Sequence, residues 1–210
     1  MTVEKQTSLI NLTPLNWFNI LTAWRVAKNI FKKEARDILI CYSGSLLPRW
    51  IWPKTNRDTI SKLSYFIAIK DKQPIGITGL YTIHNQSEEV WVDWFGLDTK
   101  LRSRGLGKEI MVATINMARK NGYKYLRLWT TTNDHQSIAA NYLYQKLGFI
   151  AQETALKSYG FPVIIYSLGL IGITPLPYEA DITTTIAGAY SNLKSRNSIF
   201  RILFRLYFKQ

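Results

Sequence analysis

A short, basic, glycine-rich segment is the part of this sequence best suited to binding a ligand. Residues 102–108 read Arg-Ser-Arg-Gly-Leu-Gly-Lys and lie between a predicted strand and a predicted helix. Backbone N–H groups at a helix start have no partner within the helix, and the helix dipole there favours negative charge. Gly105 and Gly107 carry no side chain, so a phosphate can approach the backbone closely. The segment predicts a cradle for a pyrophosphate group. The alternative is a basic helix start with turn glycines and no ligand.

Two common phosphate-binding motifs do not fit this segment. A Walker loop requires Ser or Thr after its lysine, but Glu109 follows Lys108. A dinucleotide-binding fingerprint requires a third glycine where Ile110 stands, and its loop should follow the first strand of a parallel unit. Residues 102–108 therefore belong to another class of anion-binding loop.

The hydrophobic pattern around the loop predicts a mixed sheet with helices packed on it. Alternating apolar residues indicate strands, and apolar residues at helical spacing indicate helices. The expected strands cover residues 7–12, 64–70, 75–84, 88–97, 123–131, 149–156 and 161–168. The expected helices begin at Pro14 (capped by Thr13), at Phe31, near Lys108 and after Asp134, and residues 41–58 are expected to be a loop.

Composition and charge bound the class of protein. The chain has 210 residues, of which 47% are hydrophobic, so it can bury a core and is not disordered as a whole. Cys41 is the only cysteine, which excludes a disulfide scaffold within the chain. No apolar run is long enough to span a membrane, and the N-terminus lacks a signal-peptide pattern, so we expect a cytoplasmic protein. The net charge of +13 favours anionic ligands.

The loop and three other segments together resemble one family. The pattern Arg-x-x-Gly-x-Gly at 102–107 resembles the coenzyme A loop of the GNAT superfamily of N-acyltransferases. Residues 7–17 (TSLINLTPLNW) resemble the family's first strand and its turn into the first helix, and residues 92–107 resemble its fourth strand entering the loop. Residues 140–149 resemble its late A-x-x-L-Y-x-K-x-G-F pattern. The likeness covers residues 7 to about 170.

This resemblance implies a fold and a domain organisation. The fold is α/β (α+β), with a mixed, mostly antiparallel central sheet that is flanked by helices and splayed between its fourth and fifth strands. Residues 1–170 would form the N-acetyltransferase domain, and residues 171–210 a C-terminal extension.

The resemblance also implies acetyl-CoA as the co-substrate. The backbone of Phe95, Gly96 and Leu97 would pair with the pantetheine arm, although a β-bulge at Gly96 is a second interpretation. Ser137 stands where the family often has Asn, and its hydroxyl can still bond the cofactor. The loop residues expected to contact the cofactor are Arg102, Ser103, Arg104, Gly105, Leu106, Gly107 and Lys108.

For catalysis, the resemblance places Tyr144 at the position of the general acid that protonates the leaving thiolate. A core tyrosine is the alternative. Asp93 is the first candidate for the general base and Glu89 the second, because both share a strand face with Trp91 and Phe95 by the period of two. Trp91 stands where some members carry a glutamate. We expect no metal site, because no His, Cys or carboxylate cluster has ligand spacing.

The C-terminal residues 198–208 (SIFRILFRLYF) are apolar except for two arginines. As a helix they would pack on the domain or on a second subunit, giving a homodimer. Alternatively, they would lie on a membrane surface as a peripheral contact.

The leading functional hypothesis is an N-acetyltransferase that moves an acetyl group from acetyl-CoA to a primary amine by direct attack in a ternary complex. The acceptor would be a small-molecule or peptide amine. The alternative is a non-catalytic acyl-CoA-binding sensor or scaffold. Nucleic acid is not expected as the primary partner, because the basic residues lack an interleaved base-stacking motif.

Overall fold

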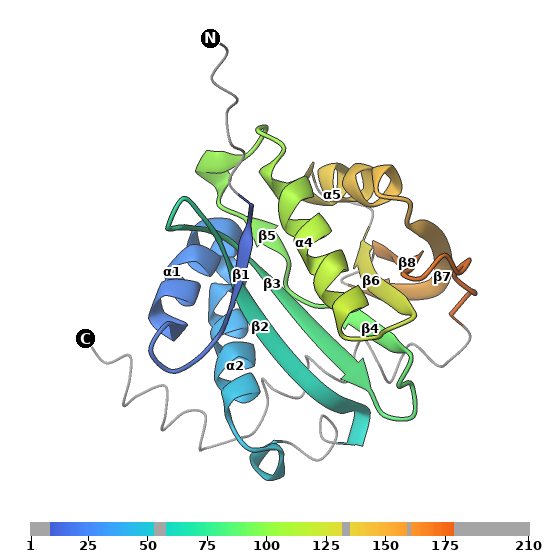
Figure 1. Cartoon of the computed structure of the whole chain (residues 1–210), viewed down its shortest axis with the longest axis horizontal. Coiled ribbons are helices and arrows are strands. Elements are labelled where there is room, and N and C mark those ends of the chain that lie inside the picture. The colour runs from blue at the N-terminus through green and yellow to red at the C-terminus, as the bar shows by residue number, and fades with distance from the viewer. Residues whose placement is uncertain (1–8, 53–57, 132–134, 159–160, 179–210) are drawn as a thin grey trace.

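The computed structural model describes residues 9–52, 58–131, 135–158 and 161–178 (Figure 1). Its strands form a single sheet in the order β1-β2-β3-β4-β6-β8-β7, with β5 paired to β3 beside this path. All pairings are antiparallel except that of β4 with β6, which is parallel. The expected mixed, mostly antiparallel sheet flanked by helices is confirmed.

The elements have the following bounds. The strands are β1 (Asn11–Pro14), β2 (Ile60–Lys70), β3 (Gln73–Ile83), β4 (Glu89–Val92), β5 (Gly96–Leu97), β6 (Tyr125–Thr131), β7 (Ile150–Ser158) and β8 (Phe161–Gly169). The α-helices are α1 (Ile20–Phe31), α2 (Ala35–Leu46), α4 (Leu106–Lys120) and α5 (His135–Lys146). The described residues also form the short 3₁₀ helices η1 (Lys32–Glu34), η2 (Arg49–Ile51) and η3 (Thr99–Leu101).

The helices cover the two faces of the sheet in pairs. On one face, α1 and α2 pack against alternate residues of β2 and β3, such as Tyr65 and Ile77. On the other face, α4 packs against the intervening positions, such as Ala68. The cluster that contains Met111 of α4 and Tyr144 of α5 continues this second face across β6 and β8. Each central strand therefore packs one of its faces against α1 and α2 and its other face against α4.

The helix expected to begin at Pro14 begins six residues later, so that prediction and the assignment of Thr13 as its cap are wrong. Pro14 ends strand β1 and pairs with Phe66. Proline is tolerated there because β1 is an edge strand. The Asn16 side-chain oxygen accepts the backbone N–H of Phe18 at 2.9 Å and that of Asn19 at 3.0 Å. These bonds form a turn between the strand and α1.

The second helix also lies further along the chain than expected. Lys32 has a φ of 42°, which interrupts the helical path after α1. Helix α2 then runs to Leu46, so the expected loop over residues 41–58 is wrong for its first six residues. Gly44 stays helical because its turn is buried and its carbonyl accepts the Trp52 indole N–H at 2.9 Å. Tertiary burial overrides the local helix-breaking signal.

The strand expected over residues 88–97 is divided into β4 and β5, so a single continuous strand is wrong there. Leu80 of β3 faces Val92, and Ile77 faces Gly96. Four steps on the β4–β5 side therefore oppose three steps on β3, which defines a β-bulge with one extra residue. The bulge reverses the sheet face toward which the following side chains point. Phe95 therefore packs in the part of the core on the α4 side of the sheet.

The chain after β8 continues to pack on the sheet. The Leu170 N–H donates to the Lys124 carbonyl at 2.8 Å, and an Arg127 guanidinium N–H donates to the Leu176 carbonyl at 2.9 Å. Tyr178 is buried edge-on against Trp91, with ring centroids 4.9 Å apart. These contacts continue the packing of the chain on the sheet as far as Tyr178. The basic, apolar segment 198–208 lies outside the described residues.

Among the helices that the structure describes, none has the length and apolar character needed to cross a membrane.

Candidate active site

The sheet opens where β4 ends. Pairing between β4 and β6 is limited to three positions, from Glu89 opposite Tyr125 to Trp91 opposite Arg127. Beyond them β6 pairs with β8 as far as Thr131, while β5 pairs with β3 alone among the described strands. The outer edge of β5 therefore keeps backbone groups for another partner, and the expected splay lies between β4–β5 and β6.

The basic loop leads from this edge into α4. Gly105 is the residue before the helix and has a φ of +76°, a conformation that favours glycine. No described side chain caps the helix start with a hydrogen bond. A Cβ placed on Gly105 or Gly107 would meet no described atom within 4 Å. The first amides of α4 therefore face open space.

Positive charge surrounds these amides. Arg102, Ser103, Arg104 and Lys108 are exposed, and Leu106 packs partly against Ala68 and its neighbours. The apolar contact fixes the helix start, while the cations lie at the surface. These features fit an anionic pyrophosphate, because the helix dipole and the fixed charges favour the same sign of ligand.

Gly96 is a glycine for a reason other than ligand approach. A Cβ at this position would lie 2.6 Å from Ile30 Cγ2 and 3.0 Å from Phe31 Cζ, both of α1. The absent side chain therefore faces the helix and allows α1 to pack against β5. The roles of Phe95, Gly96 and Leu97 in binding a cofactor through their backbone stay predictions.

Asp93 lies at the bulge, three residues before Gly96. The residue is partly buried, and its carboxyl accepts a hydrogen bond from the Tyr65 hydroxyl of β2. Burial raises the pKa of Asp93 to about 7, against the opposing effect of the hydrogen bonds from Tyr65 and from the Trp94 backbone. A carboxylate with this pKa can exchange a proton near neutral pH, which is the property required of a general base.

Several residues around Asp93 were not singled out by the sequence pattern. A Cβ on Gly79 would lie 2.5 Å from the Tyr65 ring and 3.0 Å from Asp93 Cβ, so this glycine makes room for the pair. The Cys41 thiol from α2 lies beside Tyr65 and Trp94, and burial raises its pKa. Sequence spacing could not reveal this cluster, because its members come from α2, β2, β3 and the bulge.

Glu89, the second candidate base, is engaged in an ion pair. The Arg127 guanidinium donates from Nη2 to Glu89 Oε1 at 2.8 Å and from Nε to Oε2 at 2.9 Å. Arg127 is 2% exposed and also donates to Ser167 Oγ at 2.6 Å. This bidentate geometry gives the Glu89 carboxylate a structural partner, so we retain Asp93 as the candidate base.

Tyr144, the candidate general acid, lies in the core cluster on the α4 side of the sheet. Its ring is 5.2 Å from that of Tyr166 and 5.8 Å from that of Phe149, measured between centroids. Burial raises the pKa of Tyr144, so its phenol keeps its proton at neutral pH. Val92 and Phe95 belong to the same cluster. Tyr144 and Asp93 are thus placed on opposite faces of the sheet near its opening.

Two further predictions concern Ser137 and a metal site. Ser137 belongs to α5, but its side chain lies outside the described part of the chain. Within the described ranges, no three His, Cys, Asp or Glu residues gather where they could hold a metal ion.

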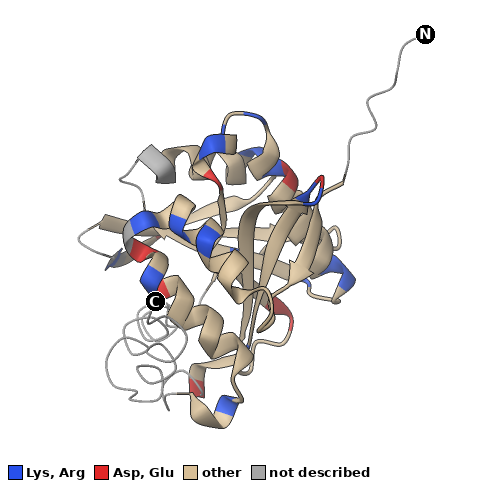
Figure 2. Cartoon of the chain, turned by 90° about the vertical axis from the view of Figure 1, so that its left-hand side faces the viewer, with Lys and Arg blue, Asp and Glu red and all other residues tan. Residues whose placement is uncertain are grey.

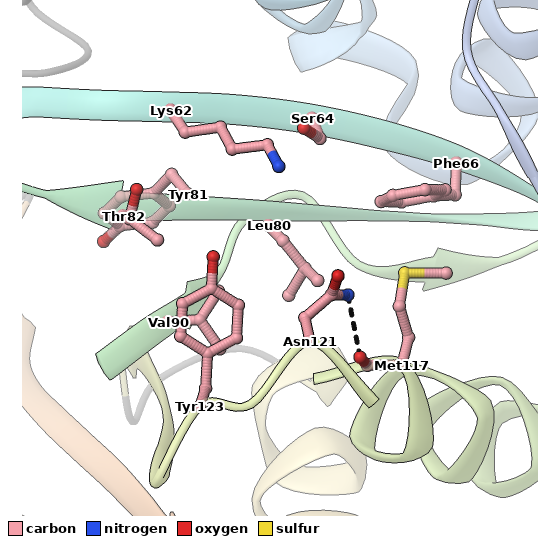
Figure 3. A pocket seen from close by; sticks show the side chains of 10 residues that line it. All are labelled: Lys62, Ser64, Phe66, Leu80, Tyr81, Thr82, Val90, Met117, Asn121 and Tyr123. Carbon is pink, nitrogen blue, oxygen red and sulfur yellow. Dashed lines mark hydrogen bonds between the residues drawn. The ribbon is translucent and has the colours of Figure 1, made fainter. Parts of the chain in front are cut away.

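A small cavity lies elsewhere, at the far end of α4 (Figure 3). It has a volume of about 40 Å³ and lies between Met117 of α4, Asn121 just after this helix, and residues of β2 and β3 such as Lys62 and Leu80. This volume suits roughly three water molecules. Because it lies at the opposite end of α4 from residues 102–108, it is separate from the candidate cofactor loop.

Comparison with known proteins agrees with this geometry. Residues 30–149 match the model of the acetyltransferase (GNAT) family, which is more than half of the chain. The chain therefore belongs to the GNAT family of acetyltransferases. No curated protein matches the sequence significantly.

Solved structures share the fold at low sequence identity. A GNAT-family protein from Desulfovibrio desulfuricans is 17% identical with a TM-score of 0.61, covering 77% of this chain and 99% of its own. A GNAT acetyltransferase from Elizabethkingia anophelis, solved with acetyl-CoA bound, is 19% identical with a TM-score of 0.53, covering 77% and 98%. The ribosomal-protein-S18-alanine N-acetyltransferase from Escherichia coli is 14% identical with a TM-score of 0.51, covering 81% and 100%.

Proposed function

We propose that this acetyltransferase moves an acetyl group from acetyl-CoA to a primary amine by direct attack within a ternary complex. The observation that carries the proposal is Asp93. Its carboxyl lies at the bulge that leads into β5, beside the opening of the sheet, and has a pKa of about 7. A primary amine must lose a proton before it attacks a thioester, and a partly buried carboxylate with this pKa suits that step.

Acetyl-CoA would be held from two directions. The first amides of α4, with Arg102, Arg104 and Lys108 around them, would bind the pyrophosphate. The unpaired edge of Phe95, Gly96 and Leu97 would pair with the pantetheine arm as an added strand. The bound acetyl-CoA of the Elizabethkingia anophelis protein supports this choice of co-substrate.

The two candidate catalytic residues would act in sequence. Asp93, as carboxylate, accepts the proton of the attacking ammonium. The neutral amine then adds to the thioester carbonyl to give a tetrahedral intermediate with a positively charged nitrogen. As the carbon–sulfur bond breaks, Tyr144 donates its phenolic proton, which its raised pKa keeps available, to the leaving thiolate. The nitrogen loses its second proton and the tyrosinate regains one, which leaves an amide, a free thiol and neutral Tyr144, and Asp93 returns its proton to solvent. Asp93 contacts Tyr65 on one face of the sheet and Tyr144 packs on the other, so the proposed proton acceptor and donor would be separated.

The acceptor would be a small-molecule or peptide amine. Trp94 follows Asp93 in the chain, and its partly buried ring lies 5.1 Å from that of Phe31, measured between centroids; the two rings would provide an apolar wall for such a group. The name of the Escherichia coli neighbour makes a peptide N-terminal alanine a suitable first acceptor to test. We retain a cytoplasmic location, an acetyltransferase domain over about residues 1–170 and a C-terminal extension as proposals.

Calorimetric titration of acetyl-CoA tests the co-substrate. We expect micromolar binding by the wild type and none by Gly105→Glu, whose anion would occupy the open space at the helix start. Lys120→Glu, at the other end of α4, has one added acid and is the matched control that should still bind. Absence of binding by folded wild-type protein would contradict the proposal.

A non-catalytic acyl-CoA sensor is the second candidate. Trp91 stands where some members carry a glutamate, and here it is fully buried against Tyr81. A thiol-release assay over a panel of amines and peptides separates the two functions. Turnover that Asp93→Asn abolishes, with acetyl-CoA affinity retained, supports an enzyme. Tight acetyl-CoA binding without turnover on any acceptor supports a sensor.

A further inference from the structure

Helix α1 exposes an apolar and cationic stripe on the side away from the sheet. Its buried face packs on the core through Ile20, Ala23, Val26, Ala27 and Ile30. The opposite side and the turn before it expose Trp17, Phe18, Leu21, Arg25 and Lys28, which we call the α1 stripe. Phe18, Leu21, Arg25 and Lys28 follow at intervals of three and four residues, so they share one side.

The apolar part of the α1 stripe is unusually open. Phe18 is 99% exposed, Trp17 44% and Leu21 43%. Large aromatic side chains at one surface location lose free energy in water unless a partner covers them. This cluster therefore indicates a binding surface.

The charge of the α1 segment itself has one sign. Between Asn11 and Lys33 the sequence contains four Lys or Arg residues and no Asp or Glu. The Lys28 ammonium lies 5.5 Å from the centroid of the Trp24 ring, which places a cation and an aromatic ring together on the same side. Figure 2 faces this side of the molecule and shows Lys and Arg residues in blue, with Asp and Glu residues in red on the helix beside α1.

We propose that the α1 stripe binds the surface of an anionic lipid bilayer. Aromatic and leucine side chains insert among the headgroups and upper acyl chains, while adjacent arginine and lysine side chains bind anionic headgroups. Charge decides between occupants, since a second copy of this chain would bring cations against cations. The proposal does not depend on the identity of the acyl acceptor.

The other end of α1 points to the candidate active site. Asn29 Nδ2 donates to Asp98 Oδ2 at 3.0 Å, just after β5, and Ile30 packs at Gly96. The twelve residues of α1 span about 18 Å. Because the α1 stripe extends from Phe18 to Lys28, a protein bound through it would lie with α1 along the bilayer surface and with the candidate active site beside the last turn of α1.

Cosedimentation of the full chain with vesicles tests this proposal. The vesicles contain phosphatidylcholine alone, or phosphatidylcholine with about a third of phosphatidylglycerol. We expect binding to the anionic vesicles only. Arg25→Glu/Lys28→Glu should reduce the partition coefficient by more than about tenfold, and Phe18→Ser by about tenfold. These side chains are exposed, so the variants should keep the wild-type melting temperature.

The matched control is Lys120→Glu/Lys157→Glu, which changes the net charge equally at exposed positions away from α1. If it weakens binding as much as Arg25→Glu/Lys28→Glu, attraction by net charge alone replaces the proposal. A chain truncated before residue 198 should still bind. Loss of binding on truncation, with no effect of the α1 substitutions, would assign lipid binding to the C-terminal segment and overturn the proposal. Light scattering that shows a dimer dependent on Phe18, without lipid binding, would also overturn the proposal.

Discussion

The two ends of β4 carry carboxylates with different environments. Glu89, at its start, is held by two hydrogen bonds from a buried arginine. Asp93, just beyond its end, meets a neutral tyrosine hydroxyl and a backbone N–H, and burial raises its pKa to about 7. The first carboxylate is stabilised as an ion by an opposite charge, whereas the second is available for proton exchange. The partner, more than the residue type or strand position, decides whether a carboxylate is structural or reactive.

The largest expected effect comes from Asp93→Asn. Removing a general base should lower kcat/KM by about 10²- to 10⁴-fold at pH 8. Acetyl-CoA affinity and melting temperature should stay near wild type, because asparagine retains the shape and can accept the Tyr65 hydrogen bond. Steady-state thiol release and calorimetry measure the two quantities. Equal kcat/KM in variant and wild type would remove Asp93 from the mechanism.

Glu89→Ala should reverse this pattern of effects. Leaving the Arg127 guanidinium buried without its carboxylate should cost about 3 kcal/mol or more of unfolding free energy. The kcat/KM of the folded fraction should change little. Urea denaturation measures the loss, and Glu89→Leu/Arg127→Met, which removes both charges, should recover most of it. If Glu89→Ala abolishes turnover at full stability, the two carboxylates have been assigned the wrong way round.

Gly79→Ala tests the packing that holds Asp93 and Tyr65 together. The new methyl group would lie within 3.0 Å of the Tyr65 ring, and such overpacking costs about 1–3 kcal/mol. Gly107→Ala is the matched control, because its methyl group would meet no described atom within 4 Å. Thermal unfolding of both variants measures the difference. Similar melting temperatures would show that the strands adjust without strain.

The smallest expected effect is a shift of the pH profile in Tyr65→Phe. Asp93 must be ionised to act, so kcat/KM of the wild type should rise with pH and level off above about 7. The Tyr65 hydrogen bond lowers the pKa of Asp93, so its removal should move the acid limb upward by about one unit. An unmoved limb would exclude Tyr65 as the partner that sets this pKa.

The unfolding free energy should depend on the same titration of Asp93, but it should fall with rising pH, whereas kcat/KM rises. The folded pKa of Asp93 is raised above its ordinary 3.8, so the folded state binds the proton more tightly. Its contribution to stability is complete below about pH 4 and is lost as the pH rises to 7. The unfolding free energy of wild type relative to Asp93→Asn should therefore fall across this range and stay level above it.

Local pattern was sufficient for the parts of the site that lie close together in sequence. The loop 102–108, the helix after it and the order of strands and helices follow from spacing and turn residues. The predicted ends of helices and strands were wrong where tertiary contacts determine them. Pro14 reads as a helix start, yet it pairs with Phe66, and Gly44 reads as a loop residue, yet burial keeps it in α2.

Sequence by itself determined the family, the mixed sheet and the position of the basic loop, because each depends on residues that are neighbours along the chain. Only the tertiary structure decided the roles of the two carboxylates. The bulge before Gly96 turns Phe95 to the other face, a change that strict alternation along a strand does not show. The partners of Glu89 and Asp93, Arg127 and Tyr65, are 38 and 28 residues away. Burial and hydrogen bonding between such distant residues set a pKa, and only the folded chain brings them together.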